Sequence, residues 1–194
     1  MTDRILSHSS FSHIVDVPIE RIDIADWLFN LPEAEYQRCC PPDHIAAGAT
    51  STDNGRRMSI NVEMIGETLM IQHYIGEITE PHLCRMVSLS DAFTRERAHE
   101  GAGAVELSVK PINSTRCEYT NSVTATPTKE FLDFIKRHGI SFEQAAAARQ
   151  AAGGDHNRRE TPLFAESIER HALNAGRHGS NMVRWKYGRR NGAG

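Results

Sequence analysis

Two residues near the end of the chain, His156 and Glu160, have the types and spacing of metal ligands. They lie in the stretch DHNRRETPLFAESIERHAL, Asp155–Leu173, which the pattern predicts to be helical. Residues four apart on a helix share one face about one turn apart, so this imidazole and carboxylate can bind one ion. The alternative is a solvent-exposed His–Glu pair on a charged helix. The stretch alone does not decide, because a metal site needs further ligands from elsewhere.

Two candidate partners lie in the first third of the chain. His44 ends the run CCPPDH, which we expect to be a rigid loop that fixes the imidazole at low entropic cost. Glu63 lies at the end of the predicted strand SINVEMIG and shares a face with two other polar residues. That face is either the solvent side or the wall of a wet cavity, and hairpin pairing would place Gln72 and Tyr74 near it.

Together, His44, Glu63, His156 and Glu160 form a set of two nitrogen and two oxygen donors from a loop, a strand and a helix. Such donors suit Zn²⁺, with Fe²⁺ or Mn²⁺ as alternatives. The cysteines do not suggest another metal or redox site, because no C-x-x-C motif connects them, and we expect reduced thiols. The cysteines are Cys39, Cys40, Cys84 and Cys117. No G-x-S-x-G nucleophile motif and no glycine-rich phosphate loop stands out.

Length and composition favour one globular domain. The chain has 194 residues, of which 39% are hydrophobic and 24% charged, and its formal net charge of −3 argues against nucleic-acid binding. No apolar run approaches the roughly 20 residues of a membrane helix, and the first residues lack a signal-peptide core, so we expect a cytoplasmic protein. We assign residues 1–175 to the domain and residues 176–194 to a basic, flexible tail.

The elements that must position these residues are predicted from periodicity and turn signals. A first strand is expected at 11–19, helical segments at 22–30 and 33–38, and a break in regular structure from 39 to 48. Five strands follow, at 57–64, 68–77, 82–93, 103–112 and 115–126, with a polar loop or lid at 94–104. Helices are expected at 129–138, at 142–152 after an N-cap at Ser141, and from 155 to about 173 beyond the interruption Gly153-Gly154.

This order gives an α+β class. A strand, helices, an antiparallel meander and C-terminal helices resemble the helix-grip fold of the START and Bet v 1-like (SRPBCC) superfamily, in which a curved antiparallel sheet wraps around a C-terminal helix. The resemblance implies a cavity between sheet and helix that takes a small hydrophobic or aromatic molecule. A homodimer and no membrane partner are the further expectations.

Three blocks resemble one enzyme family more closely, the 2,4-diacetylphloroglucinol and phloretin hydrolases, which are zinc enzymes of the Bet v 1-like fold. The blocks are EYQRCCPPDHIA, VEMIGETLMIQHY and HNRRETPLFAESI. The resemblance places the metal ligands on His44, Glu63, His156 and Glu160, and an active-site tyrosine on Tyr36. The chain departs from the family in its shorter length, in the absence of the family's long N-terminal region, in a tighter interval between the first two ligands, and in Cys39 and Cys40, which stand where an aromatic residue is expected.

The resemblance implies hydrolysis of a carbon–carbon bond in an acylated phenol, a β-diketone or a related polyketide-like ketone. The metal would polarise a carbonyl or activate water. Tyr36 would donate a hydrogen bond or proton to the ketone or phenol oxygen. Two alternatives remain open: a metal-free START-like protein that binds or carries a small molecule, and a polyketide cyclase or isomerase that uses the same pocket without hydrolysis.

Overall fold

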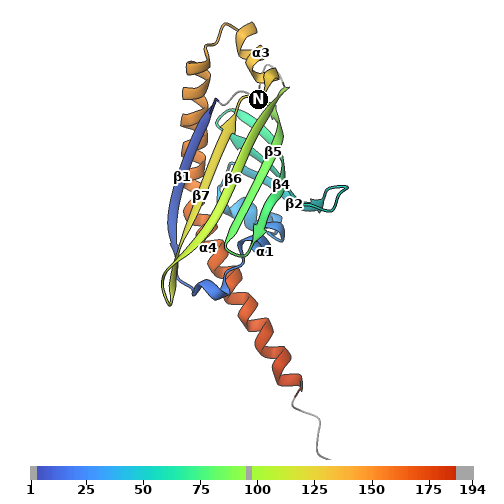
Figure 1. Cartoon of the computed structure of the whole chain (residues 1–194), viewed down its shortest axis with the longest axis vertical. Helices are drawn as coiled ribbons and strands as arrows, with labels where there is room; N and C mark the ends of the chain where they lie inside the picture. Colours follow the sequence, from blue (N-terminus) through green and yellow to red (C-terminus); the bar gives the residue numbers. More distant parts are fainter. Residues whose placement is uncertain (1–3, 95–97, 187–194) are drawn as a thin grey trace, which may run out of the picture.

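A seven-stranded antiparallel sheet and a long C-terminal helix make up most of the computed structural model, which describes residues 4–94 and 98–186. The strand order is β1-β7-β6-β5-β4-β3-β2. Figure 1 shows the curved sheet with α4 running along it beside β1 and extending beyond its end. The elements are β1 Ser7–Val15, η1 Ile19–Arg21, α1 Ile24–Phe29, α2 Glu33–Cys39, β2 His44–Ser51, β3 Arg57–Ile65, β4 Thr68–Glu80, β5 Leu83–Phe93, β6 Ala98–Asn113, β7 Arg116–Thr126, α3 Lys129–Arg137 and α4 Phe142–Lys186. This is the α+β helix-grip architecture that the sequence predicted.

The meander from β3 to β7 follows the alternation of its residues. Buried and less buried positions alternate along β4 and β5, as expected for strands with one face toward the interior. Gly66 forms the β3–β4 turn with a φ of +63°, a conformation that side chains with a Cβ rarely adopt. At the β6–β7 turn, the Asn113 side chain accepts a hydrogen bond from the backbone N–H of Thr115. The predicted hairpins are therefore confirmed.

The short helix α1 connects the sheet to α4 through buried side chains. Asp23 caps α1 by accepting a hydrogen bond from the Asp26 backbone N–H. Trp27 is 2% exposed, and its indole N–H donates to Ser167 Oγ of α4 at 3.1 Å. Its ring meets Phe164 edge to face at 5.3 Å between centroids. These contacts fix α4 against the end of the sheet where α1 and α2 lie.

The helix α4 is one continuous helix of 45 residues, so the predicted interruption at Gly153-Gly154 is wrong. Its start is the predicted one: Ser141 Oγ accepts from the Gln144 N–H, and Gln144 Oε1 accepts from the Ser141 N–H. Tertiary contacts beyond the glycines offset their low helix propensity, for example the Asn157 side chain donating to Ser9 Oγ of β1 at 2.9 Å. The helix also continues past Pro162 to Lys186.

Four other boundaries differ from the sequence prediction. The segment expected to break regular structure contains β2, which begins at His44 and pairs with β3 as the last strand of the sheet. The first strand covers 7–15 rather than 11–19. The strand β6 begins at Ala98, so part of the predicted loop or lid at 94–104 is a strand. Residues 95–97 of that segment lie outside the described residues. The end of α4 overlaps the predicted basic tail up to Lys186, and residues 187–194 lie outside the described residues.

No helix within the described ranges is long and apolar enough to cross a membrane.

We expect Trp27→Ala to lower the free energy of unfolding by about 3–5 kcal/mol, because it removes a buried ring and strands the Ser167 hydroxyl. Urea denaturation followed by circular dichroism measures this change. Leu89→Ala is the matched control, since Leu89 is 60% exposed and its loss should change stability by less than about 0.5 kcal/mol. Equal effects of the two substitutions would contradict the role assigned to Trp27.

Candidate metal centre

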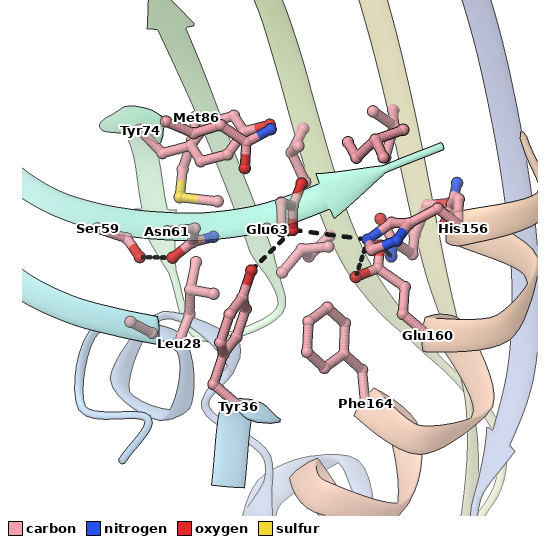
Figure 2. Close-up of a pocket in the computed structure, with 18 of the residues that line it drawn as sticks. Leu28, Tyr36, Ser59, Asn61, Glu63, Tyr74, Met86, His156, Glu160 and Phe164 are labelled. Atoms are coloured by element: carbon pink, nitrogen blue, oxygen red, sulfur yellow. Dashed lines mark hydrogen bonds and ion pairs between the residues drawn. The ribbon is translucent and has the colours of Figure 1, made fainter. Parts of the chain in front are cut away.

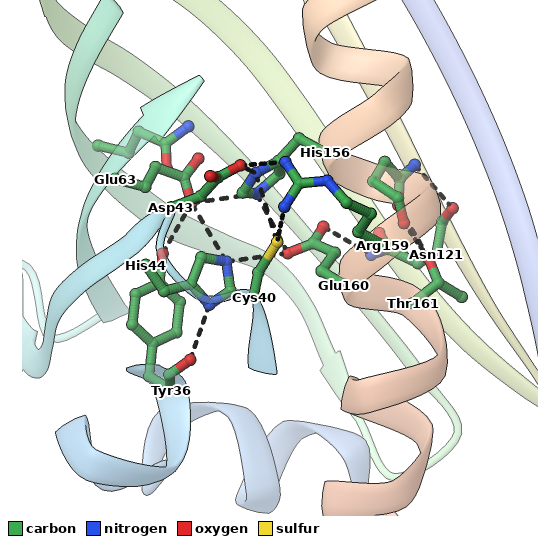
Figure 3. Close-up of polar contacts among 12 residues, drawn as sticks. Tyr36, Cys40, Asp43, His44, Glu63, Asn121, His156, Arg159, Glu160 and Thr161 are labelled. Atoms are coloured by element: carbon green, nitrogen blue, oxygen red, sulfur yellow. Dashed lines mark hydrogen bonds and ion pairs between the residues drawn. The ribbon is translucent and has the colours of Figure 1, made fainter. Parts of the chain in front are cut away.

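The four predicted ligand side chains meet inside the protein. His44 is the first residue of β2 and pairs directly with Glu63 of β3, while His156 and Glu160 project from successive turns of α4. Their exposed fractions are 4% for His44, 6% for Glu63, 5% for His156 and 7% for Glu160. Figure 3 shows the four side chains converging from the two strands and the helix. We call these four residues the donor cluster.

Each histidine of the donor cluster faces both carboxylates through Nε2. His44 Nε2 lies 3.6 Å from Glu63 Oε2 and 3.2 Å from Glu160 Oε2. His156 Nε2 lies 3.5 Å from each of the same two oxygens. Two donors bound about 2.0–2.2 Å from one ion are separated by about 3–3.5 Å at ordinary coordination angles. These four separations therefore fit one shared divalent ion.

One atom of the donor cluster lacks a hydrogen-bond partner although it is fully buried. His44 Nε2 is within ion-pair distance of both carboxylates but makes no hydrogen bond among the described residues. A buried polar atom without a partner is costly, and in native proteins it often marks an unseen water or ion. The donor set and this atom together fit a metal ion.

The charges of the cluster also call for a cation. Burial favours the neutral form of Glu160, but His156 and His44 hold its pKa at about 2. Burial likewise acts to raise the pKa of Glu63, and His156 lowers it below its usual value. Burial disfavours the imidazolium of His156, yet the charge of Glu160 raises its pKa far above the usual range. Two ionised carboxylates in one buried site are stable only with positive charge between them, supplied by a proton on His156 or by a metal ion.

The outer nitrogens of both histidines are held by fixed acceptors. His44 Nδ1 lies 2.7 Å from the Tyr36 carbonyl oxygen, and His156 Nδ1 lies 2.9 Å from Asp43 Oδ2. Arg159 in turn forms an ion pair with Asp43. An acceptor at Nδ1 favours the tautomer with its proton there, which leaves the Nε2 lone pair free for an ion. Carboxylate–histidine pairs of this kind are common around protein-bound metals.

The carboxylates are oriented in the same way. Asn121 of β7 donates from Nδ2 to Glu160 Oε1 at 3.0 Å, so Oε2 is the oxygen left for the cluster centre. The Tyr36 hydroxyl donates to Glu63 Oε2 at 2.7 Å. All four donor side chains are thus held by a contact with a further residue.

Tyr36 lies where the sequence predicted, beside the donor cluster and on the cavity wall. Its ring stacks on His44 with 3.8 Å between centroids and 1° between planes. Burial, reinforced by the charge of Glu63, raises the pKa of Tyr36 well above its ordinary value. The residue is therefore a neutral phenol at neutral pH and acts as a hydrogen-bond donor.

Cys40 adds a third kind of donor at the edge of the site. Its Sγ and one nitrogen from each of His44 and His156 lie within 4.8 Å of one another. The thiol, however, faces His156 Nδ1 at 3.8 Å, the nitrogen that is already paired with Asp43, and it accepts a hydrogen bond from Arg159. We therefore place Cys40 outside the donor cluster, as a neighbour of the Asp43–Arg159 pair.

Sequence reasoning did not identify Asp43, Arg159 or Cys40 as part of the site. Asp43 and Arg159 each stand next to a predicted ligand in the sequence, which was the available signal. It was too weak, because charged neighbours of a histidine or glutamate are common on protein surfaces. Asn121 also belongs to the site, since it is 1% exposed and lines the cavity beside the four side chains.

The donor cluster borders a narrow cavity of about 70 Å³ between the sheet and α4. Figure 2 shows its wall, where Tyr36 lies between the apolar side chains of Leu28 and Phe164 and points toward Glu63. The polar face predicted on the β3–β4 hairpin lines this cavity rather than facing solvent. Its members are Ser59, Asn61, Glu63, Gln72 and Tyr74. We call this space the inner cavity.

A second cavity of about 370 Å³ lies toward α3. Apolar side chains from the sheet, α3 and the start of α4 form much of its wall, including Met70, Phe131, Ile135 and Ile140. The two cavities share the wall residues Ile65, Gln72, Tyr74, Val123 and Arg149. A ligand in this outer cavity therefore lies next to the inner one and to the donor cluster beyond it.

Comparisons with known proteins give no family assignment. No protein-family model matches the chain, and no curated protein matches it. Solved structures with a similar backbone include the Zhui aromatase/cyclase from Streptomyces. It is 12% identical, the match covers 86% of this chain and 93% of that chain, and the TM-score is 0.49. A START superfamily protein from Mycobacterium smegmatis matches at 12% identity, 74% and 94% coverage and a TM-score of 0.42. A norcoclaurine synthase point mutant from Thalictrum flavum matches at 12% identity, 88% and 96% coverage and a TM-score of 0.45.

Proposed function

We propose that the chain is a divalent-metal-dependent hydrolase, with Zn²⁺ as the first candidate, that cleaves a carbon–carbon bond beside a ketone. The substrate class is an acylated phenol, a β-diketone or a polyketide-like ketone. One observation carries the proposal: the buried His44 Nε2 makes no hydrogen bond among the described residues, and it faces two carboxylates that line a cavity together with His156. Fe²⁺ and Mn²⁺ are the alternative metals for this donor set.

The choice of metal ligands comes from the resemblance of three separate segments to the hydrolase family. The resemblance named His44, Glu63, His156 and Glu160 without knowledge of their positions in space, and the fold brings all four together. The choice of a ketone as substrate rests on the resemblance, and the choice of a metal rests on the geometry.

The reaction would consume water and break the bond between the acyl carbon and the ring. The acyl carbon takes the water oxygen and leaves as a carboxylic acid, and the ring carbon takes a proton. A bound metal ion would supply Lewis acidity at the carbonyl and a lowered pKa for water. The chain itself supplies a proton donor, an apolar ring site and a buried space from which bulk water is largely excluded.

Tyr36 is the proton donor that the geometry favours. Its hydroxyl hydrogen points to Glu63 Oε2, on the wall that a substrate oxygen would approach. A neutral phenol in this place can donate to a ketone or phenol oxygen as negative charge builds up on it. The stacking on His44 holds the ring in one orientation, so little reorganisation is needed.

A second function deserves a test because the cavities do not depend on a metal. The outer cavity is large enough and apolar enough to hold a small aromatic or lipid molecule, and a protonated His156 would balance the buried carboxylates. The chain would then be a metal-free binding protein or a polyketide cyclase. Metal content separates this function from hydrolysis.

Protein purified without added metal should contain about one equivalent of a divalent metal, measured by elemental mass spectrometry. His156→Ala should remove most of it, because it deletes a donor and leaves two carboxylates unbalanced. His171→Ala is the matched control, since His171 lies on the same helix but is partly exposed and pairs with Asp26. Less than about 0.2 equivalents in the parent protein, with no uptake on titration with Zn²⁺, would favour the metal-free function.

Asp43→Asn should weaken Zn²⁺ binding about 10- to 100-fold, because a neutral amide no longer polarises the N–H of His156. Competition with a chromophoric chelator measures the dissociation constant. Asp155→Asn is the control, because Asp155 also pairs with Arg159 but makes no contact with either histidine. Equal affinity of the parent protein and Asp43→Asn would show that the Asp43–His156 contact does not serve a metal.

Tyr36→Phe should lower kcat for an acylated phenol such as 2,4,6-trihydroxyacetophenone about 10²- to 10⁴-fold while metal content stays the same. Mass spectrometry of the released carboxylic acid follows the reaction. Tyr119→Phe should leave kcat unchanged, because the buried Tyr119 hydroxyl has no described partner and lines neither cavity. Metal-loaded protein that releases no acid from acylphenols or β-diketones would exclude the proposed reaction.

A further inference from the structure

Among the described side chains of α4, Arg149 is a cation without a counter-ion. Arg149 makes no hydrogen bond and no ion pair within the part of the chain that the structure describes. The other arginines that follow it on α4 up to residue 170 each pair with a carboxylate. Arg149 instead lines both the inner and the outer cavity. Arg149 therefore lies at the junction of the two spaces where a ligand would lie.

Arg149 is partly buried where it lines the two cavities. Burial lowers the pKa of its guanidinium, although an arginine stays protonated at any physiological pH. The carboxylate whose charge it senses, Glu63, is already engaged by Tyr36 and His156. A buried charge is stable when it is paired, and its five N–H donors suit a carboxylate or another oxyanion.

A second donor lies beside it. Tyr74 accepts a hydrogen bond from Gln72 Nε2 at 3.1 Å, and its own hydroxyl hydrogen has no acceptor in the described ranges. Tyr74 and Gln72 both line both cavities, as Arg149 does. Burial raises the pKa of Tyr74, the charge of Glu63 adds to the rise, and the Arg149 guanidinium opposes it. Figure 2 shows Tyr74 on the wall of the inner cavity, on the strand next to Glu63.

The position of Arg149 along α4 sets the distance to the donor cluster. Arg149 precedes His156 by seven residues and lies on the same face, two turns toward the start of the helix. At 1.5 Å per residue this is roughly 10 Å along the axis. The apolar wall of the outer cavity lies on the far side of Arg149 from the cluster, near α3.

We propose that Arg149 and Tyr74 bind an anionic oxygen group of the ligand, a carboxylate or sulfonate, at the junction of the two cavities. The apolar part of the ligand fills the outer cavity. Resting on the proposed function, the substrate is an acidic ketone whose carbonyl and anionic group are roughly 10 Å apart. The anion site itself does not require a metal.

A matched pair of fluorescent probes tests the anion site. 8-Anilinonaphthalene-1-sulfonate carries a sulfonate, and N-phenyl-1-naphthylamine has the same aromatic system without it. Arg149→Gln should weaken binding of the sulfonate probe at least about tenfold and leave the neutral probe within about twofold. Arg149→Lys should restore part of the affinity, because it keeps the charge but not the planar fork. Arg116→Gln is the control, since Arg116 lines neither cavity.

Each result decides the proposal. Selective loss of the sulfonate probe supports it, whereas equal loss of both probes, or no loss of either, overturns it. Repeating the titrations with a chelator separates the two claims. If the metal-free protein still prefers the sulfonate probe, the anion site is supported even when no hydrolase activity is found. Loss of the sulfonate preference in Arg149→Gln, with the metal content of the parent protein, supports the anion site. Release of a carboxylic acid from a neutral ketone by the parent protein tests the hydrolase separately.

Discussion

The burial of Glu63 and Glu160 side by side is the constraint on which the rest of the site depends. Two carboxylates taken out of water must share a cation, and both face the Nε2 atoms of the same two histidines. Three neighbouring residues hold the four donors in place: Tyr36 contacts both His44 and Glu63, Asp43 contacts His156, and Asn121 contacts Glu160. A stable fold tolerates such a cluster only when an ion or a proton balances it.

The continuity of α4 determines the positions of the polar side chains along the cavities. One face of the helix carries Arg149, His156, Glu160 and Phe164 in succession, from the outer cavity to the packed end of the sheet. A break at the glycine pair would remove the fixed spacing between the anion site and the donor cluster. The continuous helix therefore fixes the distance between the proposed anion site and the donor cluster.

The buried hydrophobic side chains are concentrated at one end of the sheet. The large buried cluster lies where α1 and α2 meet α4 and includes Trp27, Phe29 and Phe164. At the other end only a small buried cluster remains, formed by Ile65, Met70 and Ala92, and the outer cavity takes up the space under α3. Stability comes mainly from the first end, which leaves the second end free to hold a ligand.

Local spacing and turn chemistry were enough to predict the meander and the N-cap at Ser141. Spacing alone proposed only His156 and Glu160 as a pair, and the family resemblance added weight to His44 and Glu63, which the fold places beside them. Spacing and turn chemistry failed for β2, because HIAAGATS has few β-branched or aromatic residues and becomes a strand only through pairing with β3. They failed for the glycine pair for the same reason, since tertiary contacts of Asn157 outweigh local propensity. Asp43 and Arg159 could not be assigned to the site from the sequence, because each is an ordinary charged residue there. Only the fold places Asp43 against His156 and pairs it with Arg159. The residue types of the donor cluster can thus be read from the sequence, whereas the contacts that orient their side chains arise from residues brought together by folding.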